Sequence, residues 1–220
     1  NNDEPVTIAD LEVNKLIINR INSKYPDIKW GFLSEETFKE GSYKHLDHEW
    51  LWVLDPLDGT KDFIQGTGNY AMHLALNYRN KPFIGVVLIP ERNELWISNG
   101  KNLSCENKSG HQKNISLIKN KTLNEMTIIS SKNHKDKYLE NLLSKITCKK
   151  LITMGSIGCK IASILRGESD LYISLSDPNK SSPKDWDYAA PNAILKAAGG
   201  VITNLNNEEI KYNKANLNHG

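Results

Sequence analysis

The N-terminal residues carry hydrophobic side chains at the spacing of an amphipathic helix. Leu11, Leu16 and Ile21 are among the apolar positions that recur along one face of such a helix. Thr7 is suited to cap the helix at its start, and proline cannot continue a helix, so it must stop before Pro26. We therefore expect the chain to open with one helix that ends before residue 26.

Strand-like patterns follow this helix. Residues 30–33 form a short apolar segment, and residues 50–54 form a near-continuous apolar run, which is typical of a strand covered on both faces. From residue 70 to residue 78 the pattern alternates, with every second residue, from Tyr70 to Tyr78, on one face. Two more apolar runs, 83–89 and 94–98, follow after short turns. These runs predict an antiparallel meander.

The second half of the chain mixes strands and helices. Residues 100–122 are polar and carry the weakest pattern, so we place a boundary there and divide the chain into parts 1–122 and 123–220. The expected strands span 126–129, 151–154, 170–175 and 201–204, and the expected helices span 134–146, 156–165 and 186–198. Antiparallel strands early and mixed strands with helices late predict an α+β fold.

Composition narrows the class of protein without naming a function. The chain has 220 residues, is 39% hydrophobic and 25% charged, and is therefore of ordinary globular composition rather than disordered or coiled-coil. A formal net charge of +2 predicts no nucleic-acid polymer as partner, since such proteins usually carry a clustered basic face. No apolar run approaches the roughly 18–20 residues of a membrane span, so no membrane partner is expected.

The cysteines indicate a compartment rather than a site. Cys105, Cys148 and Cys159 are odd in number and widely spaced, which favours neither a disulfide framework nor a cysteine zinc site. A reducing compartment, the cytoplasm, is the expectation. The chain opens at Asn1 without an initiator Met, and we expect it to be the body of a longer protein.

Acidic residues stand at the ends of several expected elements. They are Asp10, the pair Glu35-Glu36, Asp55 with Asp58, and Asp187. Carboxylates at strand ends and helix starts can converge on one cleft although they are far apart in sequence. Mg²⁺ prefers oxygen ligands and keeps several waters, so a few carboxylates are enough to hold it. Two such ions can clamp the attacking water and the leaving oxygen of a phosphoryl group.

The segment 53–60, V-L-D-P-L-D-G-T, is the most specific of these clusters. Asp55 lies at the exit of the expected buried strand, and Gly59 permits close approach of the backbone. Thr60 opens a short helix whose first amides suit a phosphate. A plain turn is the structural alternative, because Asp-Pro and Asp-Gly are common turn pairs. The D-x-x-D spacing excludes an aspartyl-phosphate hydrolase, which needs D-x-D.

Weaker motifs each have a structural alternative. In the segment 185–187, D-W-D, the last Asp either faces a site or only caps a helix. Lys160, after G-S-I-G at 155–158, either meets an anionic ligand or belongs to a capped helix start. His45 and His48 lack a second ligand pair, so we expect a solvated loop, or a flap beside the cleft, rather than a zinc site.

In this order, the motifs resemble the magnesium-dependent, lithium-sensitive inositol monophosphatase family. The resemblance covers essentially the whole chain. It rests on P-V-T-I-A-D at 5–10, L-S-E-E at 33–36, W-V-L-D-P-L-D-G-T-K-D-F at 52–63, and W-D-Y-A-A at 186–190 running to Gly199-Gly200. The segment 60–64, T-K-D-F-I, together with Lys160 and the closing N-H-G at 218–220, looks more like the 3′(2′),5′-bisphosphate nucleotidase branch.

The resemblance implies a fold and a set of site residues. The fold is a layered α-β-α-β-α sandwich of α+β class, with two or three Mg²⁺ ions in its site. The implied metal ligands are Glu35, Asp55, the carbonyl of Leu57, Asp58 and Asp187. Thr60, oriented by Asp10, would help to activate the attacking water. The implied substrate contacts come from Asp58, Gly59, Thr60, Ser156, Lys160 and Asp187.

The implied reaction is hydrolysis of 3′-phosphoadenosine 5′-phosphate to AMP and phosphate, a step of sulfur metabolism. The partner is then a small phosphorylated nucleotide, and the protein a monomer or homodimer. An inositol monophosphatase or sugar bisphosphatase with the same mechanism is the alternative. A non-catalytic nucleotide- or metal-binding regulator is the alternative from another class.

Overall fold

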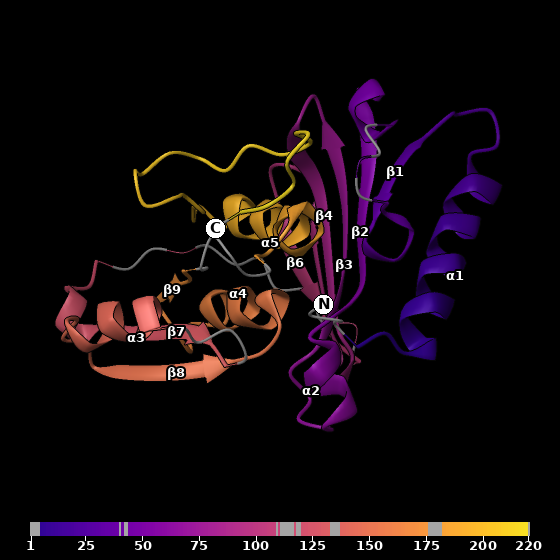
Figure 1. Cartoon of the computed structure of the whole chain (residues 1–220). Coiled ribbons are helices and arrows are strands. Elements are labelled where there is room, and N and C mark those ends of the chain that lie inside the picture. The colour runs from indigo at the N-terminus through magenta and orange to yellow at the C-terminus, as the bar shows by residue number, and fades with distance from the viewer. Residues whose placement is uncertain are drawn as a thin grey trace.

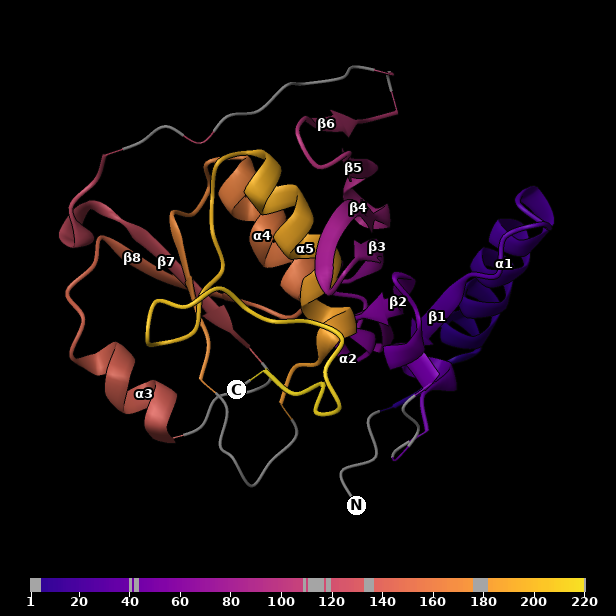
Figure 2. The same ribbon diagram turned by 90° about the horizontal axis from the view of Figure 1, so that it is seen from above.

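Five alternating layers of helices and sheets build the molecule. A computed structural model describes residues 5–39, 41, 44–108, 110, 117, 120–132, 137–175 and 182–219. The helices are α1 (Ile8–Lys24), α2 (Thr60–Ile64), α3 (Lys137–Ser144), α4 (Ile157–Leu165) and α5 (Asp185–Ala197). Helix α1 covers one face of a six-stranded sheet, α4 and α5 separate that sheet from a three-stranded one, and α3 lies beyond (Figure 1, Figure 2). This order confirms the predicted α-β-α-β-α sandwich.

The first sheet has the strand order β1-β2-β3-β4-β5-β6. Its strands are β1 (Gly31–Ser34), β2 (Trp50–Asp58), β3 (Ala71–Tyr78), β4 (Lys81–Ile89), β5 (Glu94–Ser98) and β6 (Leu103–Glu106). Strand β1 runs parallel to β2, and the other neighbours are antiparallel, which confirms the meander. Strand β6 falls in the segment where the polar sequence indicated only a boundary. Its buried Leu103 and Cys105 alternate with polar residues over too few positions to predict a strand.

The second sheet is parallel, with the order β8-β7-β9. Its strands are β7 (Thr127–Ser131), β8 (Lys150–Met154) and β9 (Leu171–Ile173). The strand expected at 201–204 is wrong: Val201 is 62% exposed, and the segment forms only an isolated bridge between Thr203 and Glu209. Ile202 packs partly against the core, but within the described residues the segment pairs with no strand of either sheet. Residues 134–136 of the expected helix 134–146 lie outside the described part of the chain.

The start of α1 shows how local sequence sets an element's boundary. Thr7 Oγ1 accepts a hydrogen bond from the Ala9 amide at 3.2 Å, as predicted for the cap. Asp10 completes a capping box, because its Oδ2 accepts from the Thr7 amide at 2.6 Å. The helix ends at Lys24, before Pro26. Asp10 is therefore held in place by the helix that it caps.

The central strands of the first sheet are covered on both faces. Helix α1 packs on β2 from one side, while α5 packs on β3 and β4 from the other. Gly85 allows this close approach, since a Cβ there would lie 2.6 Å from the Ala193 Cβ. On β3 the fully buried residues include His73 and Asn77, on the face opposite to the alternating apolar one. The alternation therefore predicted the strand but not the face that is more buried.

Two observations concern the molecule as a whole. The two sheets fall on either side of residue 122, but α5 comes from the second part and packs on the first sheet. The division at residue 122 therefore stays a proposal.

Within the described ranges, none of the helices combines the length and the apolar character that crossing a membrane requires.

Candidate active site

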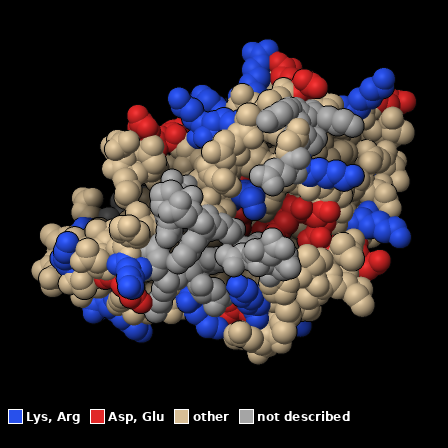
Figure 3. Space-filling view, in the orientation of Figure 1, with Lys and Arg blue, Asp and Glu red and all other residues tan. Residues whose placement is uncertain are grey.

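A single pocket collects side chains from both parts of the chain. Figure 3 shows acidic atoms gathered in a hollow of the surface, with basic side chains at its margin. The predicted site residues that line the pocket are Glu35, Asp55, Leu57, Asp58, Gly59, Thr60, Lys160 and Asp187. Two predicted residues lie behind its wall: Asp10 behind Thr60, and Ser156 behind Asp58. The motifs that are far apart in sequence therefore meet at one place.

Asp55 and Asp58 reach the pocket from the end of β2. In a regular strand, residues three apart point to opposite faces of the sheet. The register with β3 shifts between them, because Asp55 pairs with His73 whereas Asp58 pairs with Ala71. This bulge brings both carboxylates to the same pocket. Asp55 Oδ1 also accepts a hydrogen bond from the Leu57 amide at 3.0 Å, which stabilises the bulged backbone.

Asp58 connects the end of β2 to the start of α4. Its Oδ2 accepts hydrogen bonds from Ser156 Oγ at 2.7 Å and from the amides of Ile157 at 2.5 Å and Gly158 at 3.2 Å. Ser156 is also the N-cap of α4, since its Oγ accepts from the Cys159 amide at 3.2 Å. The start of α4 therefore holds Asp58 Oδ2 in place through one hydroxyl and two backbone amides.

Thr60 stands at the first position of α2 with its hydroxyl between two acceptors. Its Oγ1 lies 3.0 Å from the Leu57 carbonyl oxygen and 3.4 Å from Asp10 Oδ1. Gly59 precedes it with φ = 90°, a left-handed backbone conformation that favours glycine. Asp10 is 2% exposed and is already fixed by Thr7, so the Asp10–Thr60 pair is rigid on the Asp10 side.

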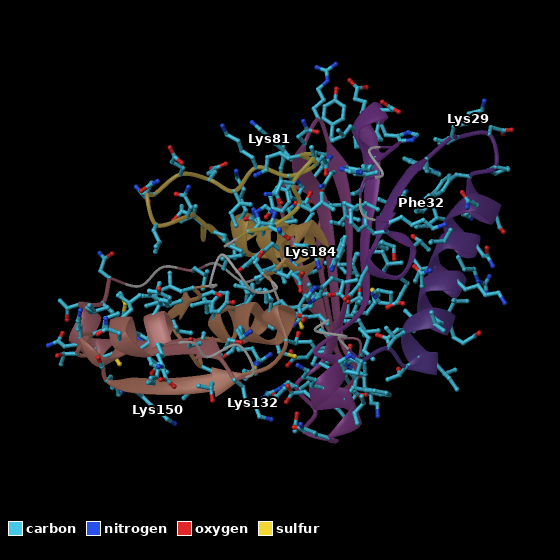
Figure 4. All side chains as sticks on the ribbon, viewed as in Figure 1. Lys29, Phe32, Lys81, Lys132, Lys150 and Lys184 are labelled. Atoms are coloured by element: carbon cyan, nitrogen blue, oxygen red, sulfur yellow. The ribbon has the colours of Figure 1, made fainter. Side chains whose placement is uncertain are left out.

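Asp187 enters the pocket from the first turn of α5. Its Oδ2 accepts a hydrogen bond from the Lys184 amide at 2.7 Å, which is the capping interaction expected as the structural alternative. The same residue lines the pocket, so capping and a site role are compatible. The Lys184 ammonium lies 5.1 Å from the centroid of the buried Trp186 ring, beside the start of α5 (Figure 4).

The electrostatics of the pocket are those of crowded carboxylates. Burial raises the pKa of Asp55 well above its ordinary value, and the charges of Glu35, Asp58 and Asp187 raise it further. The pKa of Glu36 is also raised, by partial burial and then by the charge of Asp10. Four carboxyl groups that line one pocket are suited to bind a cation. The donor set, carboxylate oxygens with the Leu57 carbonyl on the same wall, fits a hard divalent ion such as Mg²⁺.

Lys160 supplies a positive charge on the pocket wall. It is only 2% exposed, its Nζ donates to the Gly155 carbonyl at 2.5 Å, and it lies 5.1 Å from the centroid of the Tyr172 ring. A buried ammonium fixed in this way is positioned to meet an anionic or polar group of a ligand. Tyr172 and Ser174 line the same side of the pocket.

The structure adds residues that the sequence patterns did not single out. His73 on β3 is fully buried beside Asp55 and Asp58, and these three residues could hold a metal ion. Lys132, labelled in Figure 4, lies 3.1 Å from the buried Asp62 of α2 and so ties the second sheet to the site loop. No sequence pattern singled out His73, because its pairing with Asp55 becomes visible only from the strand register.

The surroundings of His45 in the structure differ from those predicted. It is 5% exposed rather than solvated, and its Nε2 lies 3.1 Å from the Lys214 carbonyl oxygen. The ring also contacts Phe38 edge to face. The solvated-loop prediction is therefore wrong for His45, because the C-terminal segment covers it.

Comparison with known proteins supports the family resemblance that the motifs carry. The model of the inositol monophosphatase family matches residues 1–219. The 3′(2′),5′-bisphosphate nucleotidase CysQ of Buchnera aphidicola is 30% identical over 210 residues, which cover 94% of this chain and 74% of that protein. CysQ of Shigella flexneri is 29% identical over 210 residues, 96% of this chain and 80% of that protein. The Nus factor SuhB of Vibrio cholerae is 27% identical over 202 residues, 91% and 72% of the two chains.

Solved structures show the same fold. The crystal structure of CysQ from Bacteroides thetaiotaomicron matches with a TM-score of 0.76 and 27% identity, covering 98% of this chain and 82% of that one. Inositol monophosphatase II from Staphylococcus aureus matches with a TM-score of 0.76 and 22% identity, over 93% and 75% of the two chains. The second likeness supports the fold alone.

Proposed function

Since the chain belongs to the inositol monophosphatase family, we propose that it is a metal-dependent phosphatase whose substrate is 3′-phosphoadenosine 5′-phosphate, with AMP and phosphate as products. The observation that carries the proposal is the convergence of four acidic motifs on one pocket that also holds the buried Lys160. The relatives named CysQ, at 27–30% identity, favour the bisphosphate nucleotide over other phosphate esters.

The residues that would hold Mg²⁺ are Glu35, Asp55, the Leu57 carbonyl, Asp58 and Asp187. When bound, the metal lowers the pKa of a coordinated water and neutralises charge on the phosphate. We propose two or three ions per site, since one ion would leave several carboxylates uncompensated. Burial, and after it the neighbouring carboxylates, raise the pKa of Asp55, which supports a cation at this place.

Thr60 and Asp10 are the proposed catalytic pair. The Thr60 hydroxyl donates toward Asp10 Oδ1, at 3.4 Å, so its oxygen can accept a hydrogen bond from an attacking water. As that water loses a proton to Thr60 Oγ1, the hydroxyl proton would pass to the Asp10 carboxylate. Asp10 fixes this orientation because Thr7 holds its other oxygen at 2.6 Å. The Thr60 side chain lines the pocket, where a phosphate ester would lie close to it. General-base assistance of this kind needs a fixed acceptor near the reacting water.

The substrate contacts are proposed on the two sides of the acidic cluster. On one side, the backbone at Asp58, Gly59 and Thr60 would hold the phosphate that is cleaved. On the other side, Lys160 would place the second phosphate or the ribose, and a bisphosphate uses both sides at once. Ser156, which lies behind Asp58, would act on the substrate through that carboxylate. An inositol monophosphate carries no second phosphate for Lys160 to pair with.

The test is a substrate panel on the full chain with Mg²⁺. Phosphate release from 3′-phosphoadenosine 5′-phosphate should have a kcat/KM at least tenfold above that from inositol 1-phosphate, since loss of one charge-assisted contact costs about 1.5–3 kcal/mol. Fructose 1,6-bisphosphate, which carries a second phosphate but no adenosine, completes the panel. Lys160→Met should reduce this preference while inositol 1-phosphate turnover stays similar. Equal or inverted rates in the unsubstituted chain would make inositol or sugar phosphates the substrates.

The same assay addresses the remaining proposals. Binding of the nucleotide without any phosphate release would favour the non-catalytic regulator. Inhibition by Li⁺ would support the lithium sensitivity that the family resemblance implies. For the compartment we propose the cytoplasm, because the three cysteines are free thiols.

A further inference from the structure

His73 is a buried side chain that the proposed chemistry leaves without a role. It lies on β3 with none of its surface exposed. Its partner across the ladder is Asp55 of β2, and residues directly opposite in an antiparallel pair project to the same face. The imidazole therefore lies next to the acidic cluster because of the strand register, on the side away from the open pocket, whose wall does not include it.

The ring faces two carboxylates at once. Its Nε2 lies 3.3 Å from Asp58 Oδ2, and its Nδ1 lies 4.0 Å from Asp55 Oδ2. Neither nitrogen completes a hydrogen bond of good geometry within the described residues, although the backbone of Trp186 is also close to the ring. Buried polar groups are nearly always bonded, so a buried imidazole between two carboxylates requires an explanation.

Gly158 on α4 leaves the space that the ring occupies. A Cβ at this position would lie 2.2 Å from His73 Nε2 and 2.9 Å from Val87 Cγ1. The Gly158 amide also donates to Asp58 Oδ2, the oxygen that His73 approaches. The ring, the glycine and the carboxylate therefore form one packed unit, in which moving any member displaces the others.

We propose that His73 is a positioning residue of the metal site, which holds Asp58 by its Oδ2 atom and thereby fixes the separation of Asp58 from Asp55. The inference rests on the proposed function, since it concerns the metal that those carboxylates would bind. The described hydrogen bonds of Asp58 all reach Oδ2, which leaves Oδ1 as the oxygen that can meet a cation. Groups behind metal ligands typically orient the ligands in this way.

A positioning role is favoured over direct ligation by two observations. Asp55 and Asp58 line the pocket whereas His73 does not, so a cation in the pocket reaches the carboxylates first. The oxygen nearest to Nε2 is already surrounded by Ser156 and the first amides of α4, which leaves little space for an ion between the two.

Two substitutions separate hydrogen bonding from packing. The amide nitrogen of His73→Gln can replace Nε2 as a donor to Asp58, whereas His73→Leu has a similar volume and no donor. The measurement is isothermal titration of the metal-free chain with Mg²⁺ alone and with Zn²⁺ alone, beside thermal unfolding without metal. His73→Leu should weaken both metals by roughly 10–100-fold, and His73→Gln should restore most of this affinity.

His45→Leu is the matched control, because His45 is also buried but contacts the Lys214 carbonyl, away from the carboxylates. It should change thermal stability and leave both metal affinities unchanged. Gly158→Ala is a second route to the same result, since the added methyl group displaces the ring; it should weaken both metals even if His73→Leu fails to fold.

Three outcomes would overturn the inference. Unchanged affinities in His73→Leu would leave the ring with a packing role only. A loss confined to Zn²⁺, which prefers imidazole more than Mg²⁺ does, would make His73 a direct ligand instead. Failure of the unsubstituted chain to bind either metal would refute the proposed function together with the inference, and is distinguishable from the other two.

Discussion

Asp58 Oδ2 accepts a hydrogen bond from Ser156 Oγ at 2.7 Å, across 98 positions of sequence. Asp58 ends a strand of the first sheet, and Ser156 begins a helix that connects two strands of the second sheet, β8 and β9. The contact therefore joins a predicted metal ligand to the cap of a buried helix. Replacing either side chain should change both the stability of the fold and the properties of the site.

Ser156→Ala should separate these two effects. Loss of the N-cap should lower the free energy of unfolding by about 1–2 kcal/mol, which corresponds to a fall in melting temperature of roughly 2–8 °C for a chain of this size. Loss of the donor to Asp58 should also weaken Mg²⁺ binding. Calorimetry with and without Mg²⁺ measures both, with Ser144→Ala, an exposed serine of α3, as the control. An unchanged gain in stability from Mg²⁺ would contradict the link.

Asp187→Asn tests the metal assignment directly. The amide keeps an acceptor for the Lys184 amide, so α5 should remain capped, but it removes one negative charge from the pocket. Mg²⁺ affinity should fall by at least roughly tenfold, and phosphate release at limiting Mg²⁺ should fall with it. Asp27→Asn, at an exposed position, is the control. Unchanged activity at every Mg²⁺ concentration would remove Asp187 from the metal site.

Asp55 should make the metal-free fold sensitive to pH. Its pKa in the folded state is raised above the ordinary value of 3.8, so the stabilising effect of its protonation is fully present below that value. This stabilisation is lost as the pH rises through the folded pKa, because a buried charge then forms. Thermal unfolding in a chelator should show higher stability near pH 5 than near pH 8, and saturating Mg²⁺ should reduce the difference.

Asp55→Asn should increase stability and abolish tight metal binding. The variant removes the buried charge and keeps an acceptor for the Leu57 amide, so the metal-free protein at pH 8 should gain about 1–2 kcal/mol. Its melting temperature should no longer respond to Mg²⁺. A variant that is less stable than the unsubstituted chain in chelator would show that the Asp55 charge is already compensated by the protein.

The cysteines should differ in reactivity. Burial raises the pKa of Cys159 to about 12, and Cys105 is also buried, whereas Cys148 is partly exposed. At pH 8 a thiol reagent should therefore label Cys148 alone in the folded chain and all three thiols in denaturant. Above the ordinary value of 9.0 the fold should lose stability, since only the unfolded Cys159 ionises readily. Labelling of the Cys148→Ser variant should be slow; rapid reaction would contradict the buried state.

The sequence predicted those features of the fold and of the site that depend on residues close together along the chain. The acidic motifs stand directly after strands or at helix starts, and the resemblance that they carry is confirmed by the family match. The antiparallel strands and the helix caps followed from alternation and from Thr7 and Ser156. The roles of the individual site residues stay predictions, although the structure brings their side chains to one place.

What the sequence could not supply depends on pairing across the sheet. His73 looks like one polar residue among apolar neighbours, and only its register with Asp55 reveals what it faces. Ser156 was expected at the substrate, whereas it lies behind Asp58, because the contact depends on how α4 docks on the first sheet. The strand expected at 201–204 was wrong because hydrophobicity alone does not provide a neighbour to pair with.

The bulge at the end of β2 places a constraint on length rather than on composition. The three steps along β2 from Asp55 to Asp58 match only two steps along the partner strand, and that mismatch turns both acids toward one cavity. Deleting one residue between them would restore regular pairing, with the two acids two positions apart on one face, but it would remove the bulged backbone that places the Leu57 carbonyl next to Thr60. Leu57 meets Thr60 through its backbone carbonyl, so this contact depends on chain length and not on the Leu57 side chain. Divergence in this segment should therefore proceed by substitution and never by insertion or deletion.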